Sequence, residues 1–374
     1  MLRTFVSFDA STIESDLMQE IYSINTNLQS IEQNICVFEF DSVIFAHALM
    51  LLGQNRNRFG YDLSLYLNTV IYFFNNSTTA VNGLIVIDKG SSDFKKRISE
   101  DLGVAISSLF MVQSLQLKWE TITQIPQNRK LSKKTPDFLG FNSDSERFIY
   151  ESKGTTQPQT VESVMSKALE QSKGYPEIAT RKFAIVSYFP TGGKSMPPFT
   201  FIADPPIYDI FIPERDNSTL LHYTYVLNFV GLENTLQAYE TMLVEKFKLD
   251  RQDEQERSLF PLPRNLGLQR FQSQTRQAFD QERLTREVFE WENRTYIGRY
   301  LDIPGAINRP FVGVHLETID QILRLDTNLA EFVDARFRSN GEEISIFSNG
   351  TIFKVQAPDT TNQPTPTTPL ERSK

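Results

Sequence analysis

The strongest constraint on the fold is a change of apolar pattern along residues 93–206. Phe94, Ile98 and Leu102 recur at the spacing of one helix face, and they open a stripe that continues to residue 112. Strand-like stretches follow at 115–125, 137–141 and 147–153. A second helical stripe occupies 161–169, and further strands are predicted at 182–188 and 200–203. The order helix, three strands, helix, strand predicts an α/β fold.

The pattern divides the chain into four parts. Residues 1–92 are predicted to be a mainly helical N-terminal region, with helices at 41–52 and 62–74. Residues 93–206 form the α/β core. Residues 207–356 are predicted to be a mixed α+β C-terminal region, mainly helical, with helices at 220–249 and 266–299 and a closing β-hairpin around Asn349-Gly350. The tail 357–374 is rich in Thr and Pro and cannot bury enough apolar surface to fold.

Composition excludes several classes of protein. The single cysteine, Cys36, can form neither an internal disulfide nor a Cys-based zinc site. The three histidines, His47, His222 and His315, lie in separate regions, which argues against a zinc hydrolase and against a Ser-His-Asp triad. A net charge of −8 argues against a broadly basic nucleic-acid coat.

Apolar runs in the chain are too short or too interrupted for a membrane span. Residues 35–53 are broken by Glu39, Asp41 and His47, and residues 66–74 are about half the ~20 residues that cross a bilayer. The N-terminus has no apolar core before Asp9 of the kind a signal peptide needs. With one cysteine, these features predict a reducing, cytoplasmic location and no membrane partner.

A pair of acidic positions and a lysine carry the chemistry of the core. Asp137 follows Pro136, and Glu151-Ser152-Lys153 comes 14 positions after Asp137, across a turn rich in Asn, Ser and Asp. On a strand, Glu151 and Lys153 point to one face. If residues 137–141 and 147–153 form an antiparallel hairpin, the two carboxylates lie side by side. Such oxygen ligands suit Mg²⁺, which can activate water and stabilise charge on an attacked phosphate.

This combination resembles the PD-(D/E)xK nuclease superfamily, the fold of many restriction enzymes and DNA-repair nucleases. The resemblance rests on Pro136-Asp137, Glu151-x-Lys153 and the surrounding αβββαβ order, and it covers roughly residues 93–206. It implies a restriction-endonuclease-like core in which Asp137 and Glu151 bind Mg²⁺, with Mn²⁺ able to substitute. Lys153 then positions or activates the water and steadies developing charge.

The resemblance also points to residues outside the hairpin. Superfamily members often add an acidic residue from the first core helix, and Asp101 is the candidate third metal ligand. Gln171 and Tyr175 resemble the Gln-x-x-x-Tyr element of the helicase-associated exonuclease branch, which usually has Asp where Glu151 stands. The resemblance implies a catalytic role for Gln171 and a nucleic-acid contact for Tyr175. A polar helix rim that ends in a packed aromatic ring is the other interpretation of these two residues.

The charge distribution is compatible with a nucleic-acid substrate. Residues 95–182 contain 14 Lys and Arg against 10 Asp and Glu, a net charge of +4, so that the remainder of the chain carries −12. Four basic residues lie in the loop that leads into Asp137, and they are the predicted phosphate contacts: Arg129, Lys130, Lys133 and Lys134. An ordinary solvated basic loop is the alternative.

Each motif taken alone has a simpler explanation. Glu-x-Lys on an exposed strand is usually a charge pair, and Pro-Asp is common in turns. Their combination favours a Mg²⁺-dependent nuclease acting on DNA, and fold-level analogy suggests restriction or phage defence. RNA is a second substrate to test, because the metal site does not read the 2′-hydroxyl. The competing hypothesis is an inactive nuclease-like subunit that binds nucleic acid or assembles with a partner. A homodimer and a defence-system partner protein are both compatible with the resemblance.

Overall fold

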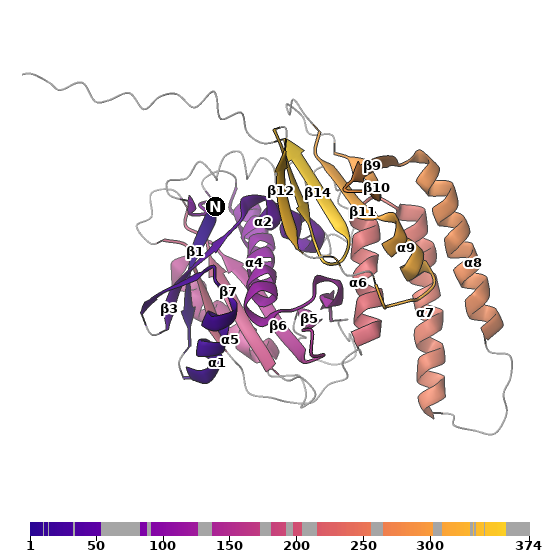
Figure 1. Cartoon of the computed structure of the whole chain (residues 1–374). Coiled ribbons are helices and arrows are strands. Elements are labelled where there is room, and N and C mark those ends of the chain that lie inside the picture. The colour runs from indigo at the N-terminus through magenta and orange to yellow at the C-terminus, as the bar shows by residue number, and fades with distance from the viewer. Residues whose placement is uncertain are drawn as a thin grey trace, which may run out of the picture.

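A computed structural model describes residues 1–9, 11–13, 15–32, 34–53, 83–87, 91–125, 137–172, 181–191, 197–203, 215–255, 265–301, 309–329, 332, 334–339 and 341–356. Two β-sheets organise these residues, one of eight strands and one of six. Figure 1 shows the larger sheet beside the smaller one, with helices α6 to α9 grouped around the smaller sheet. The chain is therefore mixed α/β.

The larger sheet has the strand order β2-β3-β1-β8-β7-β6-β5-β4. Its strands are β1 (Leu2–Phe8), β2 (Leu28–Glu32), β3 (Ile35–Phe40), β4 (Thr123–Gln124), β5 (Phe138–Phe141), β6 (Arg147–Thr155), β7 (Arg181–Tyr188) and β8 (Phe199–Ala203). The β6–β7 and β1–β8 pairs are parallel, and the other pairs are antiparallel. Alternate residues of β7 therefore face opposite sides of the sheet.

Helices cover both faces of this sheet. Phe183 and Ile185 of β7 belong to the large core that includes helix α4 (Ser92–Leu115). Ala184 and Val186, which alternate with them, pack instead with helix α5 (Val161–Ser172). Continuous burial along β7 explains why its sequence is an apolar run rather than an alternating one. None of the helices in the described ranges combines the length and apolarity that a bilayer crossing requires.

The predicted order of core elements is confirmed except at its first strand. Elements α4, β5, β6, α5, β7 and β8 occupy the expected positions. The stretch 115–125 was expected to be a strand, but α4 continues to Leu115 and a 3₁₀ turn, η3 (Trp119–Thr121), follows. Only the two residues of β4 pair with β5. Leu115, Leu117 and Trp119 are all buried without forming a strand, so burial rather than strand pairing produces the alternating apolar pattern.

The described part of the N-terminal region contains three strands in addition to helices, and the sequence interpretation did not predict these strands. Helices α1 (Ser15–Ile24) and α2 (Ser42–Gly53) are present, and α2 matches its predicted position. However, β1, β2 and β3 extend the core sheet, with β1 lying parallel to β8. The alternating burial of β1 is the strand signal that the helical interpretation overlooked. The predicted helix 62–74 lies outside the described residues.

The C-terminal region is mixed α+β, with more strand than its sequence predicted. Its helices are α6 (Arg215–Phe229), α7 (Glu233–Gln255), α8 (Asn265–Glu282) and α9 (Leu316–Leu323). The smaller antiparallel sheet has the order β12-β13-β14-β11-β10-β9. Its strands are β9 (Glu287–Trp291), β10 (Arg294–Tyr300), β11 (Phe311–His315), β12 (Ala335–Ser339), β13 (Glu342–Ile346) and β14 (Thr351–Gln356).

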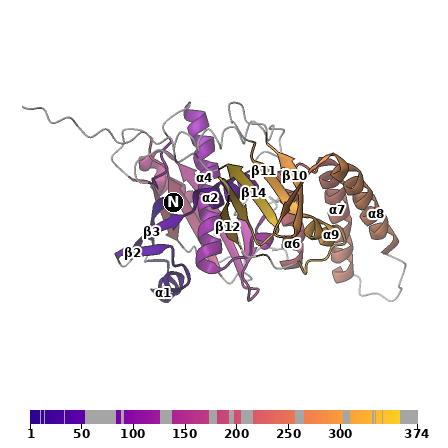
Figure 2. The same cartoon turned by 45° about the horizontal axis from the view of Figure 1, so that its top comes forward.

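Two predicted helices of this region are corrected, and the predicted hairpin is confirmed. The helix predicted at 220–249 is two helices, α6 and α7, separated at Gly231, whose φ of +79° a helix cannot continue. The helix predicted at 266–299 ends at Glu282, after which β9 and β10 turn at Glu292–Asn293. The hairpin around Asn349-Gly350 is β13–β14. In Figures 1 and 2, α7 and α8 project from the side of the smaller sheet farthest from the larger one.

A stack of four rings joins the two sheets at the tip of the β13–β14 hairpin. Phe347 lies between Trp119 of η3, at 4.3 Å between ring centroids, and His47 of α2, at 3.8 Å. His47 in turn stacks on Phe229 of α6 at 5.6 Å. All four side chains are buried. Each ring comes from a different part of the sequence, so the stack fixes the C-terminal hairpin against the core.

Polar groups flank the stack. Trp119 Nε1 donates to Asp334 Oδ2 at 2.6 Å, and the amide of Ser348 donates to Asp334 Oδ1 at 2.6 Å. Burial raises the pKa of Asp334 to about 6, with the neighbouring Glu120 adding to the effect. Burial lowers the pKa of His47 to about 3, so that its ring is neutral in the folded protein at pH 7.

We expect His47 to make folding sensitive to acid. In the unfolded chain its pKa is close to 6.5, so stability from the neutral ring is complete above that pH and falls as the pH drops toward 3. The loss is about 1.4 kcal/mol per pH unit, or about 2 kcal/mol between pH 6.5 and 5. Asp334, whose folded pKa is raised, acts in the opposite direction between about pH 6 and 4.

Comparison with His47→Phe isolates the histidine contribution, because Asp334 is common to both proteins. Denaturant unfolding at pH 7 and pH 5 should show a loss of stability about 2 kcal/mol larger in the parent protein than in His47→Phe. Equal losses in the two proteins would contradict the assignment.

Candidate active site

The β5–β6 hairpin brings the predicted acidic residues together. Phe138 pairs with Tyr150, so Asp137, directly before β5, stands beside Glu151 of β6. The turn between the strands is closed by Asn142 Oδ1, which accepts hydrogen bonds from the amides of Asp144 and Glu146. The polar turn sequence therefore sets the register that aligns the two carboxylates.

Asp137, Glu151 and Lys153 form a compact charged group, which we call the carboxylate–lysine cluster. Lys153 Nζ forms an ion pair with Glu151 Oε1 and lies 3.6 Å from Asp137 Oδ2. The backbone amide of Ser152 donates to the same Asp137 oxygen at 3.3 Å. The Glu151 side chain is fully buried, whereas Asp137 and Lys153 keep 17% and 26% of their side chains exposed. Solvent therefore reaches the cluster from the side of Asp137 and Lys153.

The two faces of β6 carry different kinds of side chain and contact different helices. Glu151 and Lys153 pair in register with Ala184 and Val186, which places them on the α5 face of the sheet. The intervening Ser152 points to α4, where its hydroxyl lies 3.0 Å from that of Ser107. Tyr150 makes the equivalent contact with Ser108 at 2.8 Å. One face of the strand thus carries the charged cluster while the other is tied to α4 by buried hydroxyl pairs.

Helix α4 contacts β6 directly through its backbone beside Lys153. A methyl group at Gly154 would overlap the carbonyl oxygen of Ser99, and one at Gly103 would lie 3.0 Å from the amide nitrogen of Gly154. Only residues without a side chain permit this approach. Gly154, which follows Lys153, is therefore held in direct backbone contact with α4.

The role of Asp101 as a third metal ligand stays a prediction. Asp101 is buried on α4, which covers the Ser152 face of the sheet, opposite to the face of Glu151 and Lys153. Across the described ranges, no three Asp, Glu, His or Cys side chains form a group that could hold a metal ion. The sequence placed Asp101 correctly near the sheet, but helix periodicity alone does not reveal which face of the sheet α4 covers.

The remaining predicted site residues have less support. Gln171 lies in the last turn of α5, half-buried, and no hydrogen bond links it to the carboxylate–lysine cluster within the described residues. Five predicted nucleic-acid contacts lie outside the described residues: Arg129, Lys130, Lys133, Lys134 and Tyr175.

Lys182 is a charged residue near the cluster that the sequence interpretation treated only as part of a strand. It pairs with Ile149 and alternates with Phe183, so it lies on the α5 face, diagonal to Glu151. Only 1% of its surface is exposed. A lysine is rarely buried to this extent unless its charge is compensated. The position of Lys182 at the start of the apolar run 182–188 was the sequence feature that could have indicated its burial.

The cluster has the donor set that Mg²⁺ or Mn²⁺ prefers. Two carboxylates from adjacent strands approach one ammonium group, so their oxygens already converge on a position suited to a cation. Together the three side chains carry a net charge of −1, which a divalent ion would make positive. Asp137 and Glu151 are the residues that could hold such an ion, with water or substrate oxygens completing its coordination.

Comparisons with known proteins find no similar protein. No protein-family model matches the chain, no curated protein matches it, and no solved structure matches its fold.

The contact between α4 and Gly154 provides a test of how the site is positioned. Gly154→Ala should cost several kcal/mol of unfolding free energy and displace Lys153, because the added methyl meets backbone that cannot rotate away. Gly140→Ala is the matched control in the same sheet, since its methyl meets the tip of the Leu117 side chain at 2.6 Å, which can move. Denaturant unfolding measures both variants, and equal costs would contradict the argument.

Proposed function

We propose that this protein is a Mg²⁺-dependent nuclease that hydrolyses DNA phosphodiester bonds. The observation that carries the proposal is the convergence of Asp137, Glu151 and Lys153 across one hairpin, with Glu151 buried and the other two side chains open to solvent. The motif resemblance and the order of core elements support the same conclusion. Metal-binding oxygens with a cation beside them can activate water and stabilise the charge that develops in phosphodiester hydrolysis.

Each residue of the cluster has a distinct task in this proposal. Asp137 and Glu151 hold the ion, which when bound supplies a polarised water and charge stabilisation. The Ser152 amide fixes the Asp137 carboxylate, so that this ligand is oriented before substrate arrives. Lys153 donates to a non-bridging phosphate oxygen or to the attacking water from the solvent side of the cluster, where its side chain is partly exposed.

The choice of DNA as substrate rests on charge and analogy. The segment 95–182 carries +4 in an otherwise acidic chain, and a polyanion approaches a local basic surface in preference to its acidic surroundings. A role in restriction or phage defence follows from the resemblance alone, whereas the proposed cytoplasmic location follows from the single cysteine and the lack of an export signal. Plasmid, linear, single-stranded and RNA substrates should therefore be compared directly.

Substitution of the cluster should abolish cleavage without unfolding the protein. Asp137→Asn, Glu151→Gln and Lys153→Met remove the charges and keep the approximate shapes of the side chains. Each should lower Mg²⁺- or Mn²⁺-dependent cleavage by about 10²-fold or more, the scale of losing one charge-stabilising group. Asp144→Asn, in the turn of the same hairpin, is the control and should cleave normally. Intact substrates throughout the panel, with the parent protein folded, would reject the enzyme proposal.

The direct ion pair between Lys153 and Glu151 favours a second candidate function. If that pair is purely structural, the core binds nucleic acid or a protein partner without cutting. Calorimetric titration with Mn²⁺ separates the two functions. Binding that disappears in Glu151→Gln supports catalysis, whereas DNA binding without Mn²⁺ binding supports the scaffold.

A further inference from the structure

Strand β9 is an exposed edge of the smaller sheet. It stands last in the strand order and pairs only with β10 among the described strands. Val288 is 59% exposed, and Leu284, in the 3₁₀ turn η5 (Arg283–Thr285) just before the strand, is 81% exposed. Large apolar side chains at an open strand edge are a liability unless something covers them.

Hydrogen-bonding groups of this edge point away from β10 at alternate residues. Glu292 and Asn293 form the two-residue turn of the β9–β10 hairpin, with φ of 48° and 61°. In such a hairpin the flanking residues, Trp291 and Arg294, bond to each other. The antiparallel alternation then leaves the backbone groups of Val288 and Glu290 facing outward. Arg286 is extended at φ −100° and continues the same side-chain alternation, but its amide already donates to the Arg283 carbonyl oxygen at 3.2 Å.

The outward residues form a self-complementary pattern. Arg286, Val288 and Glu290 lie on one face of the edge and read basic, apolar, acidic. A second copy of the strand, placed antiparallel with Val288 opposite Val288, sets Arg286 opposite Glu290 of the second copy at both ends. Two apolar side chains then meet between two opposite-charge pairs, and no like charges face each other on this side.

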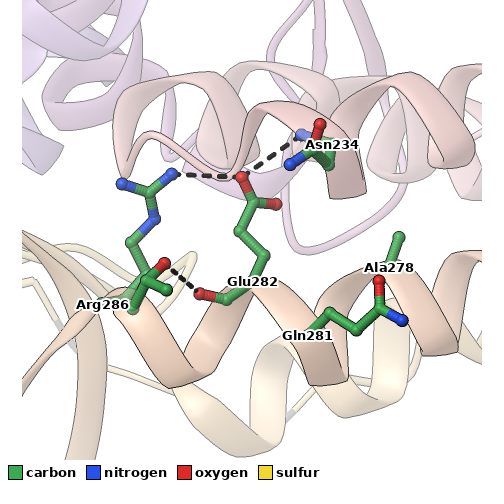
Figure 3. Close-up of a pocket in the computed structure, with 6 residues that line it drawn as sticks. Asn234, Ala278, Gln281, Glu282 and Arg286 are labelled. Atoms are coloured by element: carbon green, nitrogen blue, oxygen red, sulfur yellow. Dashed lines mark hydrogen bonds and ion pairs between the residues drawn. The ribbon is translucent and has the colours of Figure 1, made fainter.

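The surroundings of Arg286 leave room for this pairing. One guanidinium nitrogen donates to Glu282 Oε1 at 3.1 Å, and Glu282 also accepts from the amides of Asn234 and Thr235 at the start of α7. Figure 3 shows Asn234, Glu282 and Arg286 at the wall of a hollow. The volume of this hollow is about 530 Å³. The Arg286 side chain remains 24% exposed, although its Nε is buried. Glu282 thus holds Arg286 at the edge without covering it.

We propose that β9 pairs with β9 of a second copy of this chain, joining two six-stranded sheets across a two-fold axis at Val288. The pairing satisfies outward backbone groups and covers Val288, and the charge pattern selects this register over a shifted one. A two-fold arrangement through one self-complementary patch is the commonest form of homodimer. This assembly does not depend on the proposed nuclease activity.

Cysteine cross-linking tests the pairing at its centre. In the proposed register the introduced thiols of two Val288→Cys chains come within disulfide range, since paired Cα atoms of an antiparallel ladder lie about 5.5 Å apart. The native Cys36 is buried and gives little background. Val244→Cys is the matched control, because Val244 is 51% exposed on α7. Under mild oxidation Val288→Cys should form covalent dimers at least tenfold faster than Val244→Cys. Equal rates would overturn the proposal.

Sedimentation of the full chain tests the charge pattern. At about 100 μM the parent protein should sediment at twice its monomer mass of 43.0 kDa. Glu290→Lys sets lysine opposite Arg286 and should weaken the dimer by tenfold or more. Glu287→Lys, the same change on the other face of the strand, should weaken it much less. A parent protein that stays monomeric, or equal effects of the two variants, would overturn the proposal.

Discussion

The contact of α4 with β6 is the interaction on which the candidate site depends. Ser99 and Gly103 meet Gly154 through bare backbone, and Ser107 and Ser108 bond the hydroxyls of Ser152 and Tyr150 farther along the strand. Close packing of this kind transmits displacements, because protein interiors have little free volume. The same strand carries Glu151 and Lys153 on its other face. The geometry of the cluster is therefore tied to the packing of α4 on the opposite face of β6.

Both sheets depend on residues that are distant in sequence. The ring stack of Trp119, Phe347, His47 and Phe229 closes contacts between the core, α2, α6 and the C-terminal hairpin. A buried polar shell surrounds it, in which His222 Nδ1 lies 2.7 Å from the Ile122 carbonyl oxygen and Asn349 Nδ2 lies 2.8 Å from His222 Nε2. Such a joint is specific because these buried polar groups bond to partners from other elements. Core and C-terminal region consequently share one hydrophobic core.

Local sequence patterns correctly predicted the elements whose conformation depends on neighbouring residues. They were wrong for elements whose conformation depends on contacts with residues distant in sequence. The β5–β6 hairpin, α5 and the β13–β14 turn follow from turn chemistry and apolar periodicity, and all were predicted. The strand expected at 115–125 is instead a 3₁₀ turn, because Trp119 is drawn under the C-terminal hairpin. Likewise β1 pairs with β8 near residue 200, and β3 pairs in turn with β1. In the site, hairpin spacing placed Asp137 beside Glu151, but the position of Asp101 depended on how α4 crosses the sheet.

The buried position of Glu151 bears on how the proposed nuclease would change state. A fully buried carboxylate is stable only beside compensating positive charge, and Lys153 supplies it directly. A metal ion held by Asp137 and Glu151 would supply the same compensation and would repel the ammonium. Lys153 has a flexible stem and 26% of its side chain exposed, so it can turn toward solvent when the ion arrives. In the proposed nuclease, the displaced ammonium would then meet an incoming phosphate, and metal binding would be linked to substrate binding through this one side chain.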